Sequence, residues 1–545
     1  MRNAVAAPQR PATTASNLFR HQLTLSTLQV AALFFVLRMV RSLSLATLPA
    51  SLFLESSILQ ATLGHPGVAF LWGTAIIPIL FYRELRWDVL LPVPGLKYVL
   101  LAAHAALALQ YSTYEYNFVS QQTHDLDRCL VLLFGTLVWF SPVFAAPAAW
   151  SALLVAQQFD VPLATTLTDK TMLFEIAFLF HAFVLMRLVR PKTSWPAFFI
   201  AAVSLVGLHY SYPAVEKQRL DWLRHEQIEF LAAGSYHLLR WPLAWSPGDG
   251  YGMPAWTGPV MAIVTLLIEF SGFVLLFNRR AAITILIACV ALHLGIYVSS
   301  GIFFWMWIVL DVALAVAICR FRSEDCRCVF GIHAGGLCFA LQAAAILAGQ
   351  IHDSVLLNQQ TCGAVGLAWY DTPLSYRFHV EIVGSDGITY QAPPYVFAPF
   401  DSVFSQARFY SAISEKQLVD CGGTTRNLEV LDALKASRNA TDVDAVRQKL
   451  GTDRYTSDYE AAVRSLLAAY GRHATDKQTR SVFQYLPAVP RHFSSFADRT
   501  VDQPVFTPGQ CVPREIRLRL VEVLLRKNCL TPVLDRVVLR EDIHD

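Results

Sequence analysis

Lys217 is the residue whose type and position most directly suggest chemistry. It follows an apolar run, in the segment Tyr212-Pro-Ala-Val-Glu-Lys217-Gln-Arg-Leu-Asp221-Trp222. A lysine at such an edge can be an anchor, with its stem among apolar groups and its ammonium in water. If the amine is shielded from water instead, its neutral form can accept a proton and act as a general base. Asp221 and Trp222 give Lys217 mixed surroundings that an anchor does not need, so both roles stay open.

Ionisable residues inside apolar runs are the next candidates, because a charge there is costly and marks function more often than elsewhere. Glu269 lies in Leu266-Leu-Ile-Glu269-Phe-Ser-Gly-Phe-Val-Leu275, and His293 lies in the next run. Neighbouring antiparallel helices can bring two such groups to a similar depth; the alternative is a structural polar contact between helices. Glu175 and His181 share one run six positions apart, on different faces of a helix, which predicts separate structural groups.

The segment after Lys217 contains His225 and His237, twelve positions apart. This spacing matches no established zinc pattern, so we expect no metal. An amphipathic helix over residues 220–241, with arginine and tryptophan at the lipid headgroups, is the preferred interpretation. Such a helix would also roof a site beneath it.

The elements that must position these residues are membrane-spanning helices. The hydrophobic fraction is 54%, only 16% of residues are charged, and the mean hydropathy is +0.41. About 20 apolar residues span a bilayer as a helix. The predicted spans are residues 23–46, 66–83, 97–113, 129–145, 146–160, 171–188, 195–213, 258–277, 281–299, 303–320 and 331–350. The net charge of +3 is too small to favour a nucleic-acid partner.

The stretch 129–160 decides the topology, because it is either one long helix or a hairpin broken near Pro142 and Pro147. A hairpin puts four basic clusters on the side of the N-terminus: Arg83–Arg86, Arg190–Lys192, Arg279–Arg280 and Arg320–Arg322. Loops on the cytoplasmic side are rich in Lys and Arg. We therefore predict an all-α polytopic domain of about 10–11 spans over residues 23–350, with residues 1–22 in the cytoplasm. The membrane would be a bacterial inner membrane or the endoplasmic reticulum.

Residues 351–545 differ in character and predict a small α+β domain outside the cytoplasm. Residues 377–391 alternate like two strands about a Ser-Asp-Gly turn. Residues 459–470 and 514–526 have helical periodicity. Cys362, Cys421, Cys511 and Cys529 predict two disulfides in such a compartment, with three pairings open. The alternative is a cytoplasmic tail with four thiols.

The pattern Tyr210…Glu216-Lys217…Asp221-Trp222 resembles the segment after a transmembrane helix in vitamin K-dependent gamma-carboxylases. Lys217 takes the place of the second of two lysines there, and Trp222 that of a tryptophan five positions later. The run Gly272–Phe277, then His293, then Ser300–Phe303 is similar to a second part of that family, and Arg38 matches a position that is often basic. The wider group is the horizontally transferred transmembrane (HTTM) family, and the resemblance covers roughly residues 20–345.

The resemblance implies that Lys217 acts as the base on vitamin K hydroquinone or another reduced quinone. Oxygenation would yield a strong base that removes a proton from glutamate, and carbon dioxide would add. His293 and Glu269 would support catalysis, and a final set of residues would bind substrate: Trp222, Asp221, His124 and Tyr297. Glu216 stands where the family has its first lysine, and the family's other catalytic histidine has no clear match.

Two functions follow. The first is a quinol-dependent carboxylase of glutamate side chains in a protein or peptide on the extracytoplasmic side. The second is a non-enzymatic scaffold or lipid-binding module whose C-terminal domain binds an extracytoplasmic partner. A transporter is disfavoured, because neither duplicated halves nor paired broken helices are evident.

Overall fold

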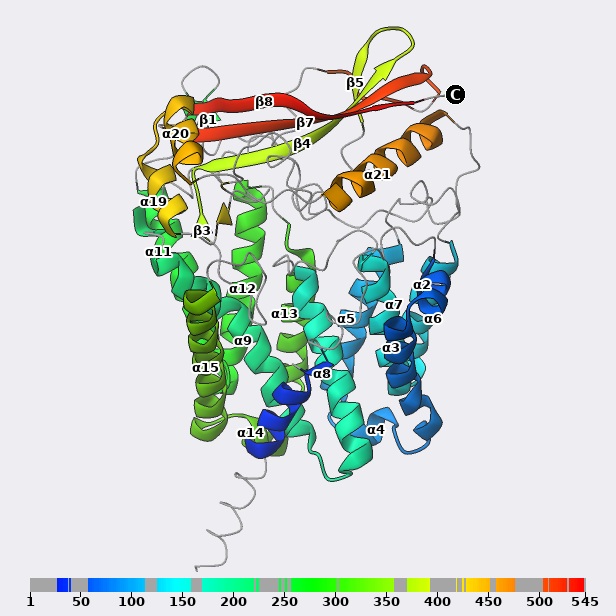
Figure 1. The fold of residues 1–545 in the computed structure, drawn as a ribbon. Coiled ribbons are helices and arrows are strands. Elements are labelled where there is room, and N and C mark those ends of the chain that lie inside the picture. The colour runs from blue at the N-terminus through cyan, green and yellow to red at the C-terminus, as the bar shows by residue number, and fades with distance from the viewer. Residues whose placement is uncertain are drawn as a thin grey trace, which may run out of the picture.

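The computed structural model shows a bundle of helices with a small β-sheet domain over one of its ends (Figure 1). It describes residues 27–37, 39–40, 57–112, 125–157, 169–219, 222–224, 245–246, 250–251, 256–300, 303–356, 370–392, 418, 424–425, 428–450, 457–475, 503–507, 509–526 and 529–543. Every structural statement below concerns these residues.

The bundle is built from long apolar helices and short 3-10 segments. They are the helix Thr27–Leu37, α2 (Ile58–Gly64), α3 (Pro66–Ile76), η2 (Ile77–Phe81), α4 (Trp87–Leu90), α5 (Pro94–Ser112), α6 (Asp125–Phe140), η4 (Pro142–Phe144), α7 (Ala145–Gln157), α8 (Asp169–Val189), α9 (Trp195–Arg219), η5 (Trp222–Arg224), α11 (Thr257–Phe270), η6 (Ser271–Val274), α12 (Arg279–Ser300), α13 (Trp305–Cys319), α14 (Ser323–Val329) and α15 (Ile332–Leu356).

Each predicted span contains a helix, although fewer helices are long enough to cross a membrane alone. Four described helices meet that length and composition, or up to six if each bent pair forms one span. The stretch 129–160 is broken at Pro142, where the missing amide ends α6, and α6 and α7 pack against each other as a hairpin predicts. The helix count of the prediction is therefore supported only in part.

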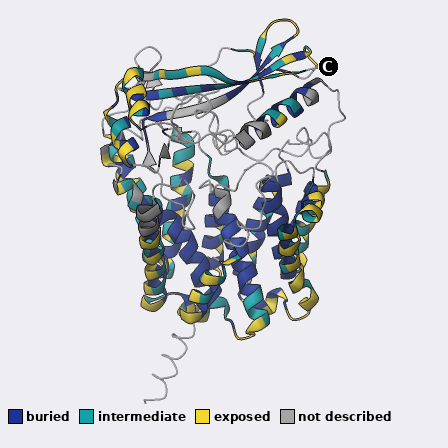
Figure 2. Ribbon diagram, in the orientation of Figure 1, coloured by how far each residue is buried: buried dark blue, intermediate teal, exposed yellow. Residues whose placement is uncertain are grey.

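Helix α9 lies at the centre of the bundle, and the outer helices present apolar surface. Of the residues in the apolar stretch of α9, 89% are buried, whereas only 22% are buried in the apolar stretches that include α11 and α12. Figure 2 shows buried residues on the inward sides of the helices and exposed ones outside. The exposed side chains include Leu63, Leu80, Phe140, Leu267 and Ile287. A soluble monomer rarely exposes apolar area on this scale, so the surface is compatible with a multi-pass membrane protein.

The four basic clusters lie at the end of the bundle away from the sheet. Figure 1 places α4 and α14, the helices beside the first and last clusters, at this end. Arg187 of α8 donates to Val89 O from Nη2 at 3.4 Å and to Thr193 O from Nη1 at 2.7 Å, which joins the helix beside the first cluster to the loop that follows the second. Arg279 Nη2 donates to Cys319 O at 2.8 Å, which joins the third to the fourth. This is the arrangement that the hairpin topology predicts.

The sheet domain comprises β1 (Trp245–Ser246), β2 (Gly250–Tyr251), β3 (Tyr370–Asp371), β4 (Leu374–Gly384), β5 (Thr389–Gln391), β6 (Thr424–Thr425), α19 (Leu428–Ala436), α20 (Ala440–Leu450), α21 (Ser457–Thr475), β7 (Pro513–Arg526) and β8 (Cys529–Asp542). The main sheet is antiparallel, with strand order β5-β4-β7-β8. The predicted hairpin at 377–391 is present as β4 and β5, and Gly387 adopts φ +79° in its turn. The predicted helix at 459–470 lies within α21.

The prediction of a helix over residues 514–526 is wrong, because this segment is strand β7. Ile516, Leu518 and Leu520 are buried at every second position, which is the period of a strand. Ile516 and Leu518 pair with Ile382 and Val380 of β4, and this face of the sheet packs against α21. The interspersed arginines and the apolar cluster near residue 524 produced the misleading helical pattern.

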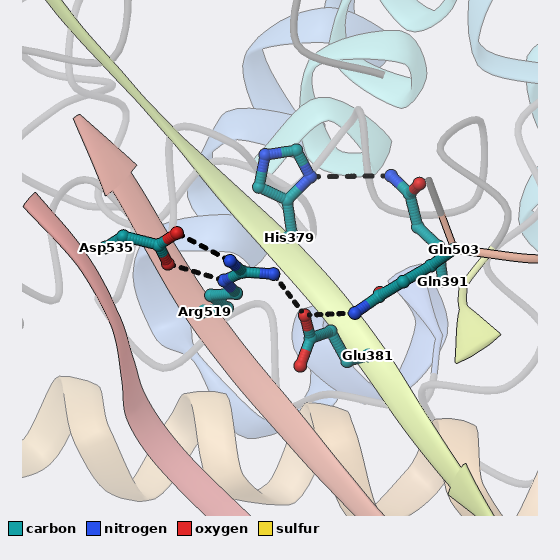
Figure 3. A network of polar contacts seen from close by, with 6 residues as sticks. All are labelled: His379, Glu381, Gln391, Gln503, Arg519 and Asp535. Carbon is teal, nitrogen blue, oxygen red and sulfur yellow. Dashed lines mark hydrogen bonds and ion pairs between the residues drawn. The ribbon is translucent and has the colours of Figure 1, made fainter. Parts of the chain in front are cut away.

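The opposite face of the sheet carries a polar network (Figure 3). Arg519 donates to Asp535 from Nε at 2.6 Å and from Nη2 at 2.5 Å, and its Nη1 donates to Glu381 Oε1 at 3.0 Å. Gln503 also donates to Glu381 Oε1, at 3.2 Å, and Gln391 lies 3.4 Å from the Nδ1 atom of His379. One guanidinium thus joins β4, β7 and β8 by two carboxylates, a geometry that suits arginine.

Cys511 is a free thiol in the structure, so it forms none of the predicted disulfides there. Its candidate partners Cys362 and Cys421 lie outside the described residues, and Cys529 begins β8 with a side chain that is not described. The described residues contain no disulfide, and the pairing stays a prediction.

Candidate functional site

Helix α9 carries the candidate site on the half nearer the sheet domain. The helix begins at Trp195, beside the basic end, and ends at Arg219. Tyr210 and Lys217 are seven residues apart, which is two turns and about 10 Å along one face of a helix. Apolar packing on every side of α9 fixes this face, so that the two side chains meet residues from α11, α12 and α13.

The Lys217 ammonium forms an ion pair with the carboxylate of Glu269 on α11. The side chains are 15% and 8% exposed, so the pair is largely removed from water. Lys217 Nζ also lies 5.0 Å from the ring centre of Trp222, within cation–π range. Glu269 Oε2 is buried without a hydrogen-bond partner among the described residues. Lys217 therefore does not extend to the surface as a plain anchor would.

Tyr210 forms a second cluster deeper in the bundle. Its hydroxyl donates to Asp311 Oδ2 of α13 at 2.5 Å and lies 2.9 Å from His293 Nε2 of α12. A phenol has a single proton, so if Asp311 accepts it, His293 must donate from Nε2. Asp311 Oδ1 is buried and has no hydrogen-bond partner among the described residues. The hydroxyl thus bridges a carboxylate and an imidazole across three helices.

Trp307 separates this cluster from a third polar pair. Its ring lies 4.9 Å from the ring of Tyr210 and 5.5 Å from that of His209, both edge-on. His209 Nε2 lies 3.0 Å from Glu175 Oε2 on α8, and both side chains are buried. The interior of the bundle therefore holds three pairs or triads of ionisable groups around α9.

A close approach between α9 and η6 sets the depth of Glu269. A Cβ atom at Gly207 would lie 2.7 Å from Gly272 O and 2.5 Å from Gln342 Nε2. Gln342 on α15 donates to Gly272 O at 3.0 Å and accepts from Ser211 Oγ at 2.7 Å. Because Gly272 follows Glu269 by less than one turn, these contacts hold the carboxylate opposite Lys217.

The structure brings together some of the predicted site residues and separates others. Lys217, Glu269 and Trp222 meet, whereas His293 contacts Tyr210 rather than Glu269. The two side chains thus meet different levels of α9, and the supporting role predicted for His293 and Glu269 stays a prediction. Tyr297 packs on Phe303 at 4.4 Å between ring centres, one turn beyond His293.

Several of the other predicted residues lie outside the described residues. Asp221 and His124 lie outside the described residues, as do most of the predicted helix 220–241 and both His225 and His237. Glu175 contacts His209 of α9, and its separation from His181 stays a prediction. His181 is buried, and its Nδ1 has no hydrogen-bond partner among the described residues.

Asp311 and His209 are the residues that the sequence interpretation missed, and Tyr210 was given no role. The signal for Asp311 was present, because it is the one acidic residue in the apolar run Trp305–Cys319. His209 also stands in an apolar run, beside Tyr210. Neither spacing nor composition could show that three helices place these groups together.

The arrangement can hold and move protons in a site removed from water. Lys217 and Glu269 are an amine and a carboxylate that can share one proton, and the Tyr210 hydroxyl can pass one between Asp311 and His293. The pairing of Lys217 with a carboxylate equally suits a structural link between α9 and α11. Comparison with known protein families, with curated proteins and with solved structures finds no match.

Proposed function

We propose that this chain is an integral membrane protein whose basic end faces the cytoplasm and whose sheet domain lies outside it. The apolar outer surface of the bundle and the grouping of four basic clusters at one end support this orientation. The sheet domain is then on the side where a protein or peptide substrate would be met. A bacterial inner membrane and the endoplasmic reticulum both fit this placement.

The function that we propose is that of a quinol-dependent carboxylase of glutamate side chains, of the HTTM type, with Lys217 as base. The observation that carries the proposal is the placement of Lys217, held by buried Glu269 against Trp222 at the sheet-facing end of α9. A general base must be positioned and shielded from water, and this lysine is both.

The residues present fit a reduced quinone. Glu269 Oε2 is a buried acceptor without a partner among the described residues, so it can accept a hydrogen bond from a hydroxyl group. The indole of Trp222 offers an aromatic face beside the amine. A bound reduced quinone would supply, on oxygenation, the strong base that the carboxylation of glutamate needs.

Each residue then has a defined task. With the shared proton on Glu269, Lys217 is a neutral amine that can take a proton, and the hydrogen bond to Glu269 keeps this amine oriented. Trp222 limits the access of water to the amine. Tyr210, His293 and Asp311 form the nearest proton-holding group at the next level of α9, and they would support the site from beneath.

The experiment is to express the full chain in membranes with reduced vitamin K, a glutamate-containing peptide and labelled bicarbonate. The proposal predicts incorporation of label by the wild type and its loss in Lys217→Ala. Lys192→Ala, an exposed lysine at the opposite end, is the matched control and should keep activity. Undiminished incorporation in Lys217→Ala would remove this residue from the mechanism.

A non-enzymatic scaffold is the second candidate, and the same ion pair favours it. Lys217 already has a carboxylate partner, as a lysine that only joins two helices would. In this case the partner-binding part is the C-terminal domain. The scaffold predicts that Lys217→Ala preserves function and that deletion of residues 352–545 abolishes it.

A further inference from the structure

An apolar groove runs along the outside of the bundle between α5 and α13, and it belongs to none of the clusters described above. Its volume is about 410 Å³, within the range of small-molecule sites. Gly95 forms part of its floor, because a Cβ atom there would lie 2.9 Å from the backbone of Ala317. Val312 and Val316 line it and are 45% and 44% exposed, so the groove is open to the surroundings of the bundle.

The length of the groove corresponds to one leaflet of a bilayer. Its lining residues on α13 extend from Ile308 to Arg320, which at 1.5 Å per residue is about 18 Å. The hydrocarbon core of a bilayer is about 30 Å thick, so each leaflet contributes about half of that. A single acyl chain spans this length, and the valines and alanines of the lining suit it.

The groove ends at positive charge. The Arg320 guanidinium lies 5.7 Å from the ring centre of Tyr98, and Arg279 Nη2 donates to the carbonyl of the neighbouring residue Cys319. Among the described residues, no carboxylate pairs with either arginine. The guanidinium group of Arg320 at the mouth of an apolar groove complements a phosphate attached to an apolar chain.

We propose that this groove binds an anionic phospholipid, with one acyl chain along α13 and the phosphate at Arg320. The proposal rests on the membrane location proposed above, but it requires neither carboxylation nor Lys217. The bound lipid would fill the space between α5 and α13 and hold the basic end of the bundle at the headgroup level.

The test uses the full chain purified in detergent and native mass spectrometry with added phosphatidylglycerol or phosphatidylcholine of the same acyl chains. We expect the wild type to bind phosphatidylglycerol about fivefold more tightly, and Arg320→Gln to lose most of this preference. Arg190→Gln removes an exposed charge at the same end and should bind like the wild type. Ala313→Phe fills the groove and should lower the binding of both lipids.

Three results would overturn the proposal: equal binding of the two lipids by the wild type, unchanged preference in Arg320→Gln, or unchanged binding in a folded Ala313→Phe protein. Arg320 is exposed, so its variant tests the headgroup contact even if Ala313→Phe fails to fold. Lys217→Ala should bind both lipids like the wild type, which separates this test from that of the carboxylase. Recovery of the chain in the soluble fraction would instead refute the membrane location.

Discussion

Lys217 and Glu269 form an ion pair that joins α9 to α11 across the sheet-facing half of the bundle. Fifty-two residues separate them along the chain, and the contact depends on the close approach of Gly207 to Gly272 one level below. The pair is both the strongest candidate for chemistry and a link between two helices. Its two roles make different predictions.

The contribution of this ion pair to the stability of the protein can be measured by replacing one partner and then both. Glu269→Leu or Lys217→Met leaves a buried charge without its partner, which typically costs about 3–5 kcal/mol. The double variant leaves no charge and should recover most of this loss. Thermal unfolding of the purified proteins in detergent measures it, and a double variant as unstable as the sum of the singles would contradict a direct pairing.

The Tyr210 hydroxyl is predicted to stabilise the bundle through Asp311 and His293. Tyr210→Phe leaves both partners buried without this hydroxyl, which should cost about 1–3 kcal/mol of unfolding free energy. Tyr98→Phe is the matched control, because Tyr98 is half-exposed on the outside of the bundle. Equal stability of the two variants in a denaturant titration would show that the bridge contributes nothing.

The contact between α9 and η6 should tolerate no side chain. Gly207→Ala places a Cβ atom within 2.7 Å of Gly272 O, so the backbone must shift, at a cost on the order of 1–3 kcal/mol. Gly73 lies inside α3, where a Cβ atom would meet nothing within 4 Å, and Gly73→Ala should be neutral or stabilising by up to about 1 kcal/mol. The melting temperatures of the two variants should therefore move in opposite directions or by clearly different amounts.

The β4–β5 hairpin should depend on pH through Asp386 and Tyr390. Hydrogen bonds from the Tyr390 hydroxyl and the Ile388 amide lower the pKa of Asp386 from 3.8, and the bond to Asp386 raises the pKa of Tyr390 to about 12. The contribution of Asp386 is thus present above pH 3.8 and is lost as pH falls through its lowered pKa. That of Tyr390 is present below pH 10 and is lost as pH rises towards 12.

The measurement for the hairpin is the melting temperature of the wild type and of Asp386→Asn as a function of pH. The difference between them should be present at pH 7 and shrink at both extremes. Asp432→Asn on α19 changes an exposed carboxylate and should show no such profile. A difference that stays constant from pH 3 to pH 12 would contradict the hydrogen-bond assignment.

Hydrophobic runs and turn residues predicted much of the fold. Apolar runs located the helices, and the Ser-Asp-Gly turn located the β4–β5 hairpin. The prediction for segment 514–526 failed because its second half does not alternate in polarity: Glu522 occupies a buried position, in an ion pair with Arg447, while Val521 and Val523 lie on the other face of β7. Local periodicity cannot reveal this exception, since the partner of Glu522 lies on α20, far away in the sequence.

The sequence predicted individual residues of the candidate site, but it did not predict which of them contact one another. Lys217 and Glu269 were chosen for their positions in or beside apolar runs, and the structure pairs them. His293 and Asp311 contact the Tyr210 hydroxyl because α12 and α13 are oriented about their own axes so that these side chains face α9. The orientation of each helix is set by packing across the whole bundle, and it cannot be predicted from the sequence of one helix.

The most direct test of the central claim is chemical rescue of Lys217→Ala. With reduced vitamin K, a glutamate peptide and labelled bicarbonate, the variant should lose activity by about 10²–10⁴-fold, the usual contribution of a general base. Added methylamine should restore part of it in Lys217→Ala and leave Lys192→Ala unchanged. Incorporation of label by Lys217→Ala at the wild-type rate, with or without the amine, would contradict the assignment of Lys217 as the base.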